Sequence, residues 1–395
     1  MRLGAVVNAG LVAASLLFAL ALSEIVVRVM NLEPPALWEF NQTVGWTYQP
    51  GIHTWYKSPE FNSWVEINSR GLHDREHPYA KPPGVFRILL LGDSFTGALE
   101  VPFESSFARL LEKRLNELAP STRFEVINAG VGGFSTVNEL LMFREEGAKY
   151  RPDLVLLCFV DADIRDNFHV TADATVPGSP YFVLADGNLQ LRHHPTGVMT
   201  RAKRLVGRLR VVRLAYRMWA SFGPGRAQAD GRPSDAGGGS RTLPMNSLYS
   251  ETRPPEWAQA IAITRALMTQ LNREVSAAGA HLAIVSLGSM EGEAIRQKSG
   301  KPELGPEREL GELLASLRVP HVFASVCLYD EEHTRGQAIR FKRDRHLNVH
   351  GHQLVARNVE ALLTENGLLP ASVPRRDSAL ALRSGGCAGL GGGGS

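Results

Sequence analysis

The chain has 395 residues, of which 44% are hydrophobic, and its 43 basic and 40 acidic residues leave a formal net charge of +3. This length and apolar content suit one large α/β domain with insertions or two smaller domains. The near balance of charge argues against nucleic acid as a partner. Cys158, Cys327 and Cys387 show no CxxC spacing, so we expect no disulfide framework, no thiolate metal site and no cofactor.

The chain begins with an apolar segment. Residues 3–22 carry no charge, and a helix that rises about 1.5 Å per residue would cross roughly 30 Å of hydrocarbon over this length. This predicts a transmembrane helix within residues 1–30. A cleaved signal peptide is the alternative, because Ala19-Leu20-Ala21 has the small-x-small pattern of a cleavage site. The charge of Arg2 places the N-terminus in the cytoplasm, which predicts a periplasmic domain held by the inner membrane.

Regular alternation of strands and helices starts after residue 85. Residues 31–85 are rich in proline and aromatic residues without a clear period, so we expect an irregular segment packed on the main domain. Strands are predicted at 86–92, 123–130 and 153–160, with helices at 106–118 and 136–150. The third strand is a continuous apolar run, which is typical of a strand with helices on both faces of its sheet. The pattern is a βαβαβ succession.

The alternation stops between about residues 168 and 250, which we interpret as an insertion. It contains a predicted hairpin around Asp186-Gly187 and a stretch at 225–240 with the composition of a disordered loop. Further elements are predicted at 256–278 (helix), 281–286 (strand), 307–317 (helix), 321–325 (strand) and after Gly351 (helix). The whole pattern predicts an α/β fold with a doubly wound, mainly parallel five-stranded sheet over 86–369. The linker-like residues 370–395 are expected to be disordered.

Residues 201–217 form a basic stretch inside this insertion, with seven basic side chains and no acidic one. The opposite face of the predicted helix carries Leu205, Leu209, Val212, Tyr216 and Trp219. A basic amphipathic helix of this kind can lie on anionic lipid or bind an acidic polymer. A solvated helix that packs its apolar side on the domain is the alternative.

Small and polar residues follow the predicted strands where each strand ends. Gly92-Asp93-Ser94 follows the first strand, Gly133 lies beyond the second, and Asp161 to Asp163 follow the third. Because the carboxyl ends of parallel strands form one crevice, we expect these residues to converge. A histidine that arrives from the loop before the last helix would complete a hydrolytic site. Ser94 as a mere helix N-cap is the alternative interpretation.

The order of these motifs resembles the SGNH, or GDSL-like, hydrolase family. "GDSFTG" at 92–97 is similar to the family's first block and "NAGVGG" at 128–133 to the second. "DRHLN" at 344–348 is similar to the last block, although spaced D-x-H rather than the more usual D-x-x-H. The resemblance covers about residues 85–167 and 281–365. It implies a flavodoxin-like fold and a serine esterase or O-acyltransferase, and it extends to exported, membrane-anchored members that modify cell-surface polysaccharides.

The resemblance also implies a role for each site residue. Ser94 would be the nucleophile, His346 the base that removes its proton, and Asp344 the acid that orients the imidazole. The backbone N–H groups of Ser94 and Gly133 would face the oxyanion of the tetrahedral intermediate. The implied substrate is an acyl ester, with acylated carbohydrate as the expected partner.

The third block departs from the family's pattern. Where the family has G-x-N-D or G-N-D, Asp161 and Ala162 stand in place of the glycine and the asparagine, and alanine offers no donor. The loss of one such donor typically lowers turnover by roughly 10²–10³. Three outcomes are open: a slow enzyme, a replacement donor such as Asn167 in the oxyanion hole, or a catalytically silent polysaccharide-binding or assembly protein.

A metal site is the other interpretation of the last motif. His346, His350 and His352 could bind a metal together with Asp344, because imidazoles at i and i+4 share a helix face. We favour the view that His350 and His352 begin and pack the final helix, and we expect no metal. Asp163 is expected to cap a helix or to accept a hydrogen bond within its loop.

Overall fold

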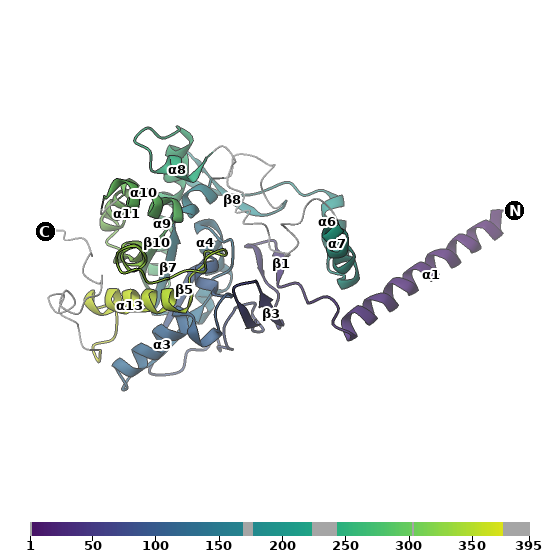
Figure 1. The fold of residues 1–395 in the computed structure, drawn as a ribbon, viewed down its shortest axis with the longest axis horizontal. Coiled ribbons are helices and arrows are strands. Elements are labelled where there is room, and N and C mark those ends of the chain that lie inside the picture. Colours follow the sequence, from purple (N-terminus) through teal and green to yellow (C-terminus); the bar gives the residue numbers. More distant parts are fainter. Residues whose placement is uncertain (1, 169–176, 223–242, 302–303, 374–395) are drawn as a thin grey trace. The chain divides into compact units, whose positions relative to one another are not determined.

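The structure is a computed structural model that describes residues 2–168, 177–222, 243–301 and 304–373 (Figure 1). Two compact units are distinguished: residues 1–39 with 195–234, and residues 40–194 with 235–395. The predicted disordered loop at 225–240 lies outside the described residues, as does the tail beyond residue 373.

The first unit contains one long apolar helix and two short amphipathic helices. These are α1 (Arg2–Val29), α6 (Val198–Gly207) and α7 (Arg210–Phe222). Within α1, Val6–Val29 is long and apolar enough to cross a membrane, a property that signal sequences share.

The basic stretch forms two helices, and the prediction of one continuous helix over 201–217 is wrong. The chain leaves α6 at Arg208, and α7 starts at Arg210. The backbone N–H groups of Arg210 and Val211 donate to the two carboxylate oxygens of Glu24, at 3.0 and 2.9 Å. A carboxylate on the first free N–H groups of a helix favours a new start at that point. This partner lies 186 residues away in the sequence, so no local pattern could reveal the break.

A parallel five-stranded sheet forms the centre of the second unit. Its strands are β5 (Val85–Gly92), β6 (Arg123–Asn128), β7 (Leu154–Val160), β10 (His281–Gly288) and β11 (His321–Phe323). Their order is β11-β10-β7-β5-β6, and all neighbouring pairs are parallel. Counted along the chain this is the 2-1-3-4-5 order of flavodoxin-like folds, which confirms the predicted fold class. The last strand is shorter than predicted, because Ala324 already begins a helix.

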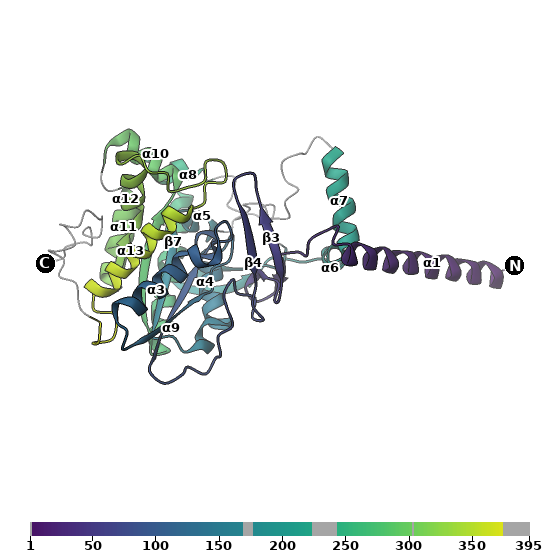
Figure 2. The ribbon, with the colours of Figure 1, turned by 60° about the horizontal axis from the view of Figure 1, so that its bottom comes forward.

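Helices cover both faces of this sheet, which explains the continuous apolar runs of β5 and β7. On one face, α3 (Phe107–Leu118) and α13 (Val349–Glu365) lie side by side (Figure 2). Ile88 and Leu90 of β5 belong to the core beneath these helices. The intervening Leu89 points the other way, towards the end of α4 (Thr136–Glu145), which packs with α9 (Glu256–Ala277).

The described part of the second unit also contains helical elements of 3 to 12 residues. They are α2 (Ser94–Gly97), η1 (Phe103–Ser105), η2 (Gly147–Tyr150), α5 (Ala162–Asp166), α8 (Met245–Leu248), α10 (Met290–Ser299), α11 (Gly305–Ser316), α12 (Ala324–Tyr329) and η4 (Asp330–Thr334). The sequence predicted α11 and the last helix, α13, which begins at Val349 and not after Gly351.

Residues 31–85 contain strands, so the prediction of an irregular segment is wrong. The strands are β1 (Trp38–Asn41), β2 (Gly45–Tyr48), β3 (His53–Lys57) and β4 (Asn62–Glu66), which form two two-stranded sheets. Side chains of β4 alternate regularly between buried and exposed. The apolar pattern did not show this alternation, because Trp55 and Trp64 occupy solvent-facing positions.

The predicted hairpin is present in the insertion. It joins β8 (Pro180–Ala185) to the antiparallel β9 (Asn188–His193). Asp186 and Gly187 both adopt positive φ angles, 52° and 76°. This is the backbone that a two-residue turn of the type favoured by Asp-Gly requires.

Candidate active site

Ser94 lies at the carboxyl end of β5, where it begins the short helix α2. The helix cap is Asp93, whose carboxylate accepts the N–H of Phe95 at 2.9 Å. The alternative in which Ser94 is merely a cap is therefore wrong, and its hydroxyl is left available at a half-buried position. The turn is tight enough to require Gly92, since a Cβ there would lie 2.1 Å from the hydroxyl of Thr96.

The structure brings Ser94, His346 and Asp344 together. Ser94 Oγ lies 2.8 Å from Nε2 of His346, and Nδ1 of His346 lies 2.5 Å from Oδ1 of Asp344. With the proton on Nδ1 donated to Asp344, Nε2 can accept the hydroxyl proton of Ser94. The short D-x-H spacing is accommodated by Arg345, which adopts a left-handed φ of 74° between the two functional residues.

A second carboxylate, which the sequence reasoning missed, faces the same histidine. Glu100 is buried, and its Oε1 lies 3.5 Å from Nδ1 of His346. Burial alone would lower the pKa of His346, but the carboxylates of Glu100, Asp344 and Asp93 raise this pKa to about 9. The charged imidazolium is thus favoured at neutral pH. The only sequence signal was a charged residue in the otherwise apolar stretch that follows the first block.

Among the described residues, the group that could hold a metal ion consists of Glu100, Asp344 and His346. Ligand atoms of Glu100, Asp344 and His346 lie within 4.8 Å of one another. The alternative metal set is not assembled. His350 instead pairs with Glu331 at 2.9 Å, and the buried His352 accepts the backbone N–H of Phe107 at 3.3 Å. Burial lowers the pKa of His352 to about 3, so it packs as a neutral ring.

Gly133 lies on an exposed turn with a φ of 81°. Two aromatic residues of β2 hold this turn. The indole N–H of Trp46 donates to the carbonyl of Gly132 at 2.9 Å, and the hydroxyl of Tyr48 accepts the N–H of Gly132 at 3.1 Å. A Cβ at Gly97 would lie 2.6 Å from the same Tyr48 hydroxyl, which therefore sits between this turn and α2. The sequence reasoning missed both aromatic residues.

Asn128, at the end of β6, ties the glycine turn to the serine turn. Its side-chain amide donates to the carbonyl of Thr96 at 2.9 Å, and its carbonyl accepts the N–H of Gly130 at 3.0 Å. No side chain would fit at Gly130, since a Cβ would lie 2.5 Å from Cβ of Thr96. The asparagine of the second block therefore fixes the distance between the two turns.

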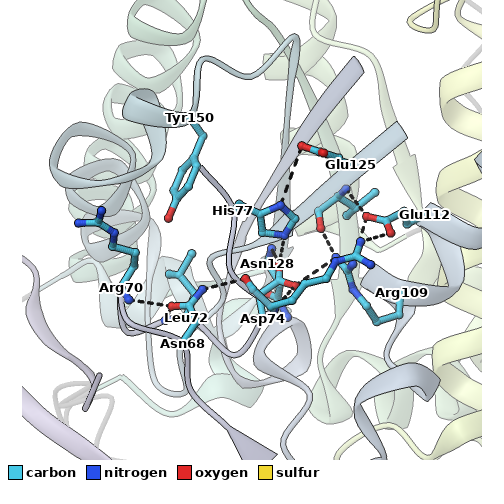
Figure 3. A network of polar contacts seen from close by, with 12 residues as sticks. Asn68, Arg70, Leu72, Asp74, His77, Arg109, Glu112, Glu125, Asn128 and Tyr150 are labelled. Atoms are coloured by element: carbon cyan, nitrogen blue, oxygen red, sulfur yellow. Dashed lines mark hydrogen bonds and ion pairs between the residues drawn. The ribbon is translucent and has the colours of Figure 1, made fainter. Parts of the chain in front are cut away.

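A buried polar network supports Asn128 from behind (Figure 3). Asp74 accepts the backbone N–H of Asn128 at 2.7 Å and lies 3.5 Å from both Arg109 and His77. Burial opposes the charge of this carboxylate, but Arg109 and His77 hold the pKa of Asp74 below its usual range. Arg109 in turn pairs with Glu112 at 3.1 Å. Charged groups that are this buried are stable only because each has partners.

Glu60, also missed, holds the loop that carries Asp344. It lies in the turn between β3 and β4, and its carboxylate accepts three consecutive backbone N–H groups, those of Lys342, Arg343 and Asp344, at 2.8, 2.7 and 2.8 Å. Next to it, the ring of Phe61 packs against Phe341 with centroids 5.2 Å apart.

The third block supplies no replacement for the missing asparagine. Ala162 begins α5 and packs half-buried against the core. Asn167 is fully buried, accepts the N–H of Val137 at 3.1 Å and donates to the hydroxyl of Thr264 at 3.0 Å. Of the three open outcomes, the one in which Asn167 is the replacement donor is therefore not supported, because its amide is buried and already hydrogen-bonded. Asp163 accepts the N–H of Val160 at 3.1 Å, the predicted bond within the loop.

Two backbone donors remain for an oxyanion. In the part of the chain that the structure describes, neither the N–H of Ser94 nor that of Gly133 donates to another protein group. Both follow the carboxyl ends of adjacent strands, β5 and β6. The site thus combines a serine hydroxyl next to an imidazole, a carboxylate on the other ring nitrogen and two open backbone N–H groups, an arrangement that suits acyl transfer.

No protein-family model and no curated protein sequence matches the chain. Solved structures do match. TesA is 15% identical over 72% of this chain and 99% of its own, with a TM-score of 0.37. Axe2, an acetylxylan esterase from Geobacillus stearothermophilus, is 12% identical over 74% and 97%, with a TM-score of 0.37. A two-domain esterase active on acetylated mannans is 13% identical over 74% and 52%, also with a TM-score of 0.37.

The chain has an SGNH-hydrolase-like fold. This assignment rests on its own strand order and on the order in which the sequence blocks meet at the sheet edge. Identities of 12–15% and TM-scores of 0.37 decide neither the activity nor the substrate.

Proposed function

We propose that the chain is a membrane-anchored serine esterase of the SGNH type that acts on acyl esters of cell-surface carbohydrate. The observation that carries the proposal is the 2.8 Å contact of Ser94 Oγ with His346 Nε2. A serine hydroxyl is a poor nucleophile on its own, and a base at this distance is what activates it.

The proposed reaction has two steps. Nε2 of His346 takes the proton of Ser94 as Oγ bonds to the acyl carbon, and the N–H groups of Ser94 and Gly133 stabilise the oxyanion. The bond to the sugar oxygen then breaks as Nε2 returns the proton to it. In the second step Nε2 takes a proton from water, or from a second sugar hydroxyl, as the oxygen of that group bonds to the acyl carbon. The bond to Ser94 Oγ then breaks as Nε2 returns the proton to Oγ. Asp344 holds the imidazole throughout.

A fluorophosphonate probe followed by intact-mass analysis tests the nucleophile. The probe should add once to the wild-type chain and should fail with Ser94→Ala and with His346→Ala. Ser105→Ala is the matched control, because Ser105 is a neighbouring half-buried serine outside the proposed triad. Labelling that persists in Ser94→Ala contradicts the assignment. An acetyl group found on an added oligosaccharide, rather than released as acetate, would identify an O-acyltransferase.

Carbohydrate is proposed as the acyl carrier because of an aromatic pair on the β3–β4 hairpin. Trp55 and Trp64 are cross-strand partners, 50% and 42% exposed, with ring centroids 5.3 Å apart. Polar side chains, among them Lys57 and Glu66, flank them on the same exposed face. Aromatic faces bordered by hydrogen-bonding groups suit the apolar faces and hydroxyl edges of sugar rings. Glu60, at the tip of the same hairpin, holds the Asp344 loop.

We also propose that α1 anchors the protein in the membrane, with the residues that follow α1 outside the cytoplasm. The span Val6–Val29 supports this, and a signal sequence would meet the same criteria. Extraction at alkaline pH separates the two, since an anchored chain stays with the membrane and a cleaved one is released with a new N-terminus near Leu22. A periplasm-active reporter fused to the C-terminus tests the side of the membrane.

A catalytically silent binding protein is the second candidate, and the third block favours it. Ala162 offers no donor, and the buried Asn167 does not replace it. Absence of probe labelling and of esterase activity, in a folded chain that still binds polysaccharide, would select this function.

A further inference from the structure

Helices α6 and α7 expose an apolar surface that no other described residue of the first unit covers. Its exposed members are Val198, Met199, Leu205, Val206, Tyr216, Met218 and Trp219. Tyr216 and Trp219 are 63% and 70% exposed, although both are large apolar side chains. A surface of this kind marks an interaction site.

The basic side of α7 contacts the segment that follows α1, so the opposite, apolar side is the one exposed to solvent. Arg213 and Arg217, one turn apart, both reach the carboxylate of Glu33, at 3.6 and 3.0 Å. Arg217 also donates to the carbonyl of Leu32 at 3.0 Å. The segment that leaves α1 therefore binds the charged face of α7.

Hydrogen bonds to Glu24 hold the start of α7 at a fixed position along α1. Glu24, whose carboxylate receives the first N–H groups of α7, lies about 27 Å along the helix from Val6, where the span begins. The hydrocarbon core of a bilayer is about 30 Å thick. An α1 that spans the membrane places Glu24 at the boundary between hydrocarbon and headgroups. The hydrogen bonds bring the beginning of α7 to the same boundary.

The charges on α6 suit the headgroups at this boundary. Arg201, Lys203 and Arg208 are exposed, and no acidic residue occurs between 201 and 217. Tryptophan and tyrosine concentrate at membrane interfaces, and basic side chains there pair with anionic lipids. The combination of apolar face, aromatic residues and basic flank is that of a helix lying in the interface plane.

We propose that α6 and α7 lie in the interface of the membrane that α1 crosses, with Trp219 among the acyl chains and the basic side chains of α6 on anionic headgroups. The inference rests on the proposed anchor and not on the proposed esterase. With this placement the protein has a second membrane contact besides the span of α1. The two contacts together hold the first unit in one orientation at the membrane surface.

The test uses the full chain in nanodiscs whose lipids carry bromine on the acyl chains, which quenches tryptophan fluorescence on contact. The chain has six tryptophans, so the contribution of Trp219 is the difference between wild type and Trp219→Phe. We expect brominated lipid to quench less emission in Trp219→Phe than in wild type, and the difference should equal about the emission of one tryptophan. Because Trp219 is mostly exposed, this variant should fold normally, which far-UV circular dichroism checks.

Two further arms separate the proposal from its rivals. Neutral lipids in place of anionic ones, or Arg201→Gln with Lys203→Gln, should reduce the Trp219 quenching at least twofold. Equal quenching in wild type and Trp219→Phe overturns the proposal. The proposal is also overturned if soluble polygalacturonate shifts the emission of Trp219 while brominated lipid does not quench it. That result would mean that the apolar face binds an acidic polymer. Alkaline extraction reports the anchor separately. A chain that is cleaved and released has lost the span on which the depth of α7 depends, and this result overturns the proposal together with the anchor.

Discussion

The carboxylate of Glu100 lies 3.5 Å from Nδ1 of His346, the ring nitrogen that donates to Asp344. The proposed base therefore carries two carboxylates on one side and a serine hydroxyl on the other. Together with Asp93 these carboxylates raise the pKa of His346 to about 9, although burial works in the opposite direction. A raised pKa makes the neutral imidazole a stronger base for the serine proton. It also means that only a small fraction of the imidazole is neutral at neutral pH.

The first prediction concerns the pH profile of ester hydrolysis. Only the neutral imidazole can accept the serine proton, so kcat/KM for 4-nitrophenyl acetate should rise with pH and level off above about pH 9. Glu100→Gln removes one of the charges that favour the imidazolium. The rising limb of this variant should move to lower pH by about one unit.

Glu104→Gln is the control for this shift, because Glu104 is exposed in the same segment and is not among the groups that raise the pKa of His346. Its profile should coincide with that of the wild type. Coinciding profiles for Glu100→Gln and wild type would show that Glu100 does not act on His346.

The second prediction concerns the loop that carries Asp344. Glu60→Ala leaves three backbone N–H groups without their acceptor, so Asp344 should be held less well against His346. We expect kcat to fall about 10-fold with KM little changed, since misplacement of a catalytic group costs turnover rather than binding. Glu60→Gln, which keeps one acceptor oxygen, should fall less.

Glu76→Ala is a matched control for Glu60→Ala. Glu76 is also a surface carboxylate that accepts a backbone N–H, that of Ser69 at 2.6 Å, but it holds a different loop. Its removal should leave kcat unchanged. An unchanged kcat in Glu60→Ala as well would mean that the loop keeps its shape without this carboxylate.

The third prediction tests the aromatic pair. Trp55→Ala with Trp64→Ala should lower kcat/KM for acetylated polysaccharide about 10-fold and leave 4-nitrophenyl acetate hydrolysis unchanged, because the small ester needs no sugar contact. Leu191→Ala, which removes a 43% exposed apolar side chain from the other hairpin, is the control and should change neither. Equal losses on both substrates would indicate damage to the fold instead of a lost sugar contact.

The central fold could be predicted from the sequence because its middle strands contain compact apolar runs between turn residues. β7 is buried along its whole length and β5 at every residue except Phe86, so their composition alone identifies them. The β3–β4 hairpin could not be predicted, since Trp55 and Trp64 face solvent and hide the period of two. The break between α6 and α7 is set by Glu24, which is remote in the sequence.

Motif order predicted which residues would meet at the site, and the structure does bring Ser94, His346 and Asp344 together. Their catalytic roles remain predictions. Residues that hold this set in place were missed, because their position is decided by tertiary packing alone. Glu60, for example, contacts backbone groups more than 280 residues further along the chain. Whether Asn167 could replace the missing donor stayed open, because its burial cannot be seen in a local polar sequence.

The fourth prediction concerns the network behind Asn128. Asp74→Asn removes the charge that faces Arg109 and His77, and should lower the free energy of unfolding by about 3–5 kcal/mol at neutral pH. The pKa of Asp74 is lowered in the folded state, so its contribution is present above the unfolded pKa of about 3.9 and is lost as pH falls through the folded pKa. The difference between variant and wild type should therefore shrink below about pH 4.

Urea denaturation in detergent micelles at several pH values measures this difference. Asp153→Asn is the comparison, since Asp153 also pairs with a basic side chain, that of Lys81, and also accepts a backbone N–H, but its side chain is 30% exposed. It should cost only about 1 kcal/mol. A difference for Asp74→Asn that stays constant down to low pH would mean that Asp74 is not charged in the folded chain.

The last prediction decides whether the oxyanion hole lacks a donor. Ala162 stands where the resemblance expects an asparagine, and its half-buried side chain ends in a methyl group. Ala162→Asn restores an amide at this point and should raise kcat for short-chain esters by up to roughly 10²-fold if the amide reaches the oxyanion. The gain must disappear in Ala162→Asn with Ser94→Ala, which ties it to the proposed nucleophile.

Asn167 supplies the contrast to Ala162, because its amide is committed to Val137 and Thr264 in the interior. Asn167→Ala should lower the free energy of unfolding, by about 1–3 kcal/mol for the buried groups left unpaired, without a selective loss of kcat in the chain that remains folded. A selective loss of kcat at full stability would return Asn167 to the oxyanion hole. If neither variant shows activity that depends on Ser94, while the folded chain binds polysaccharide, the serine turn belongs to a binding protein.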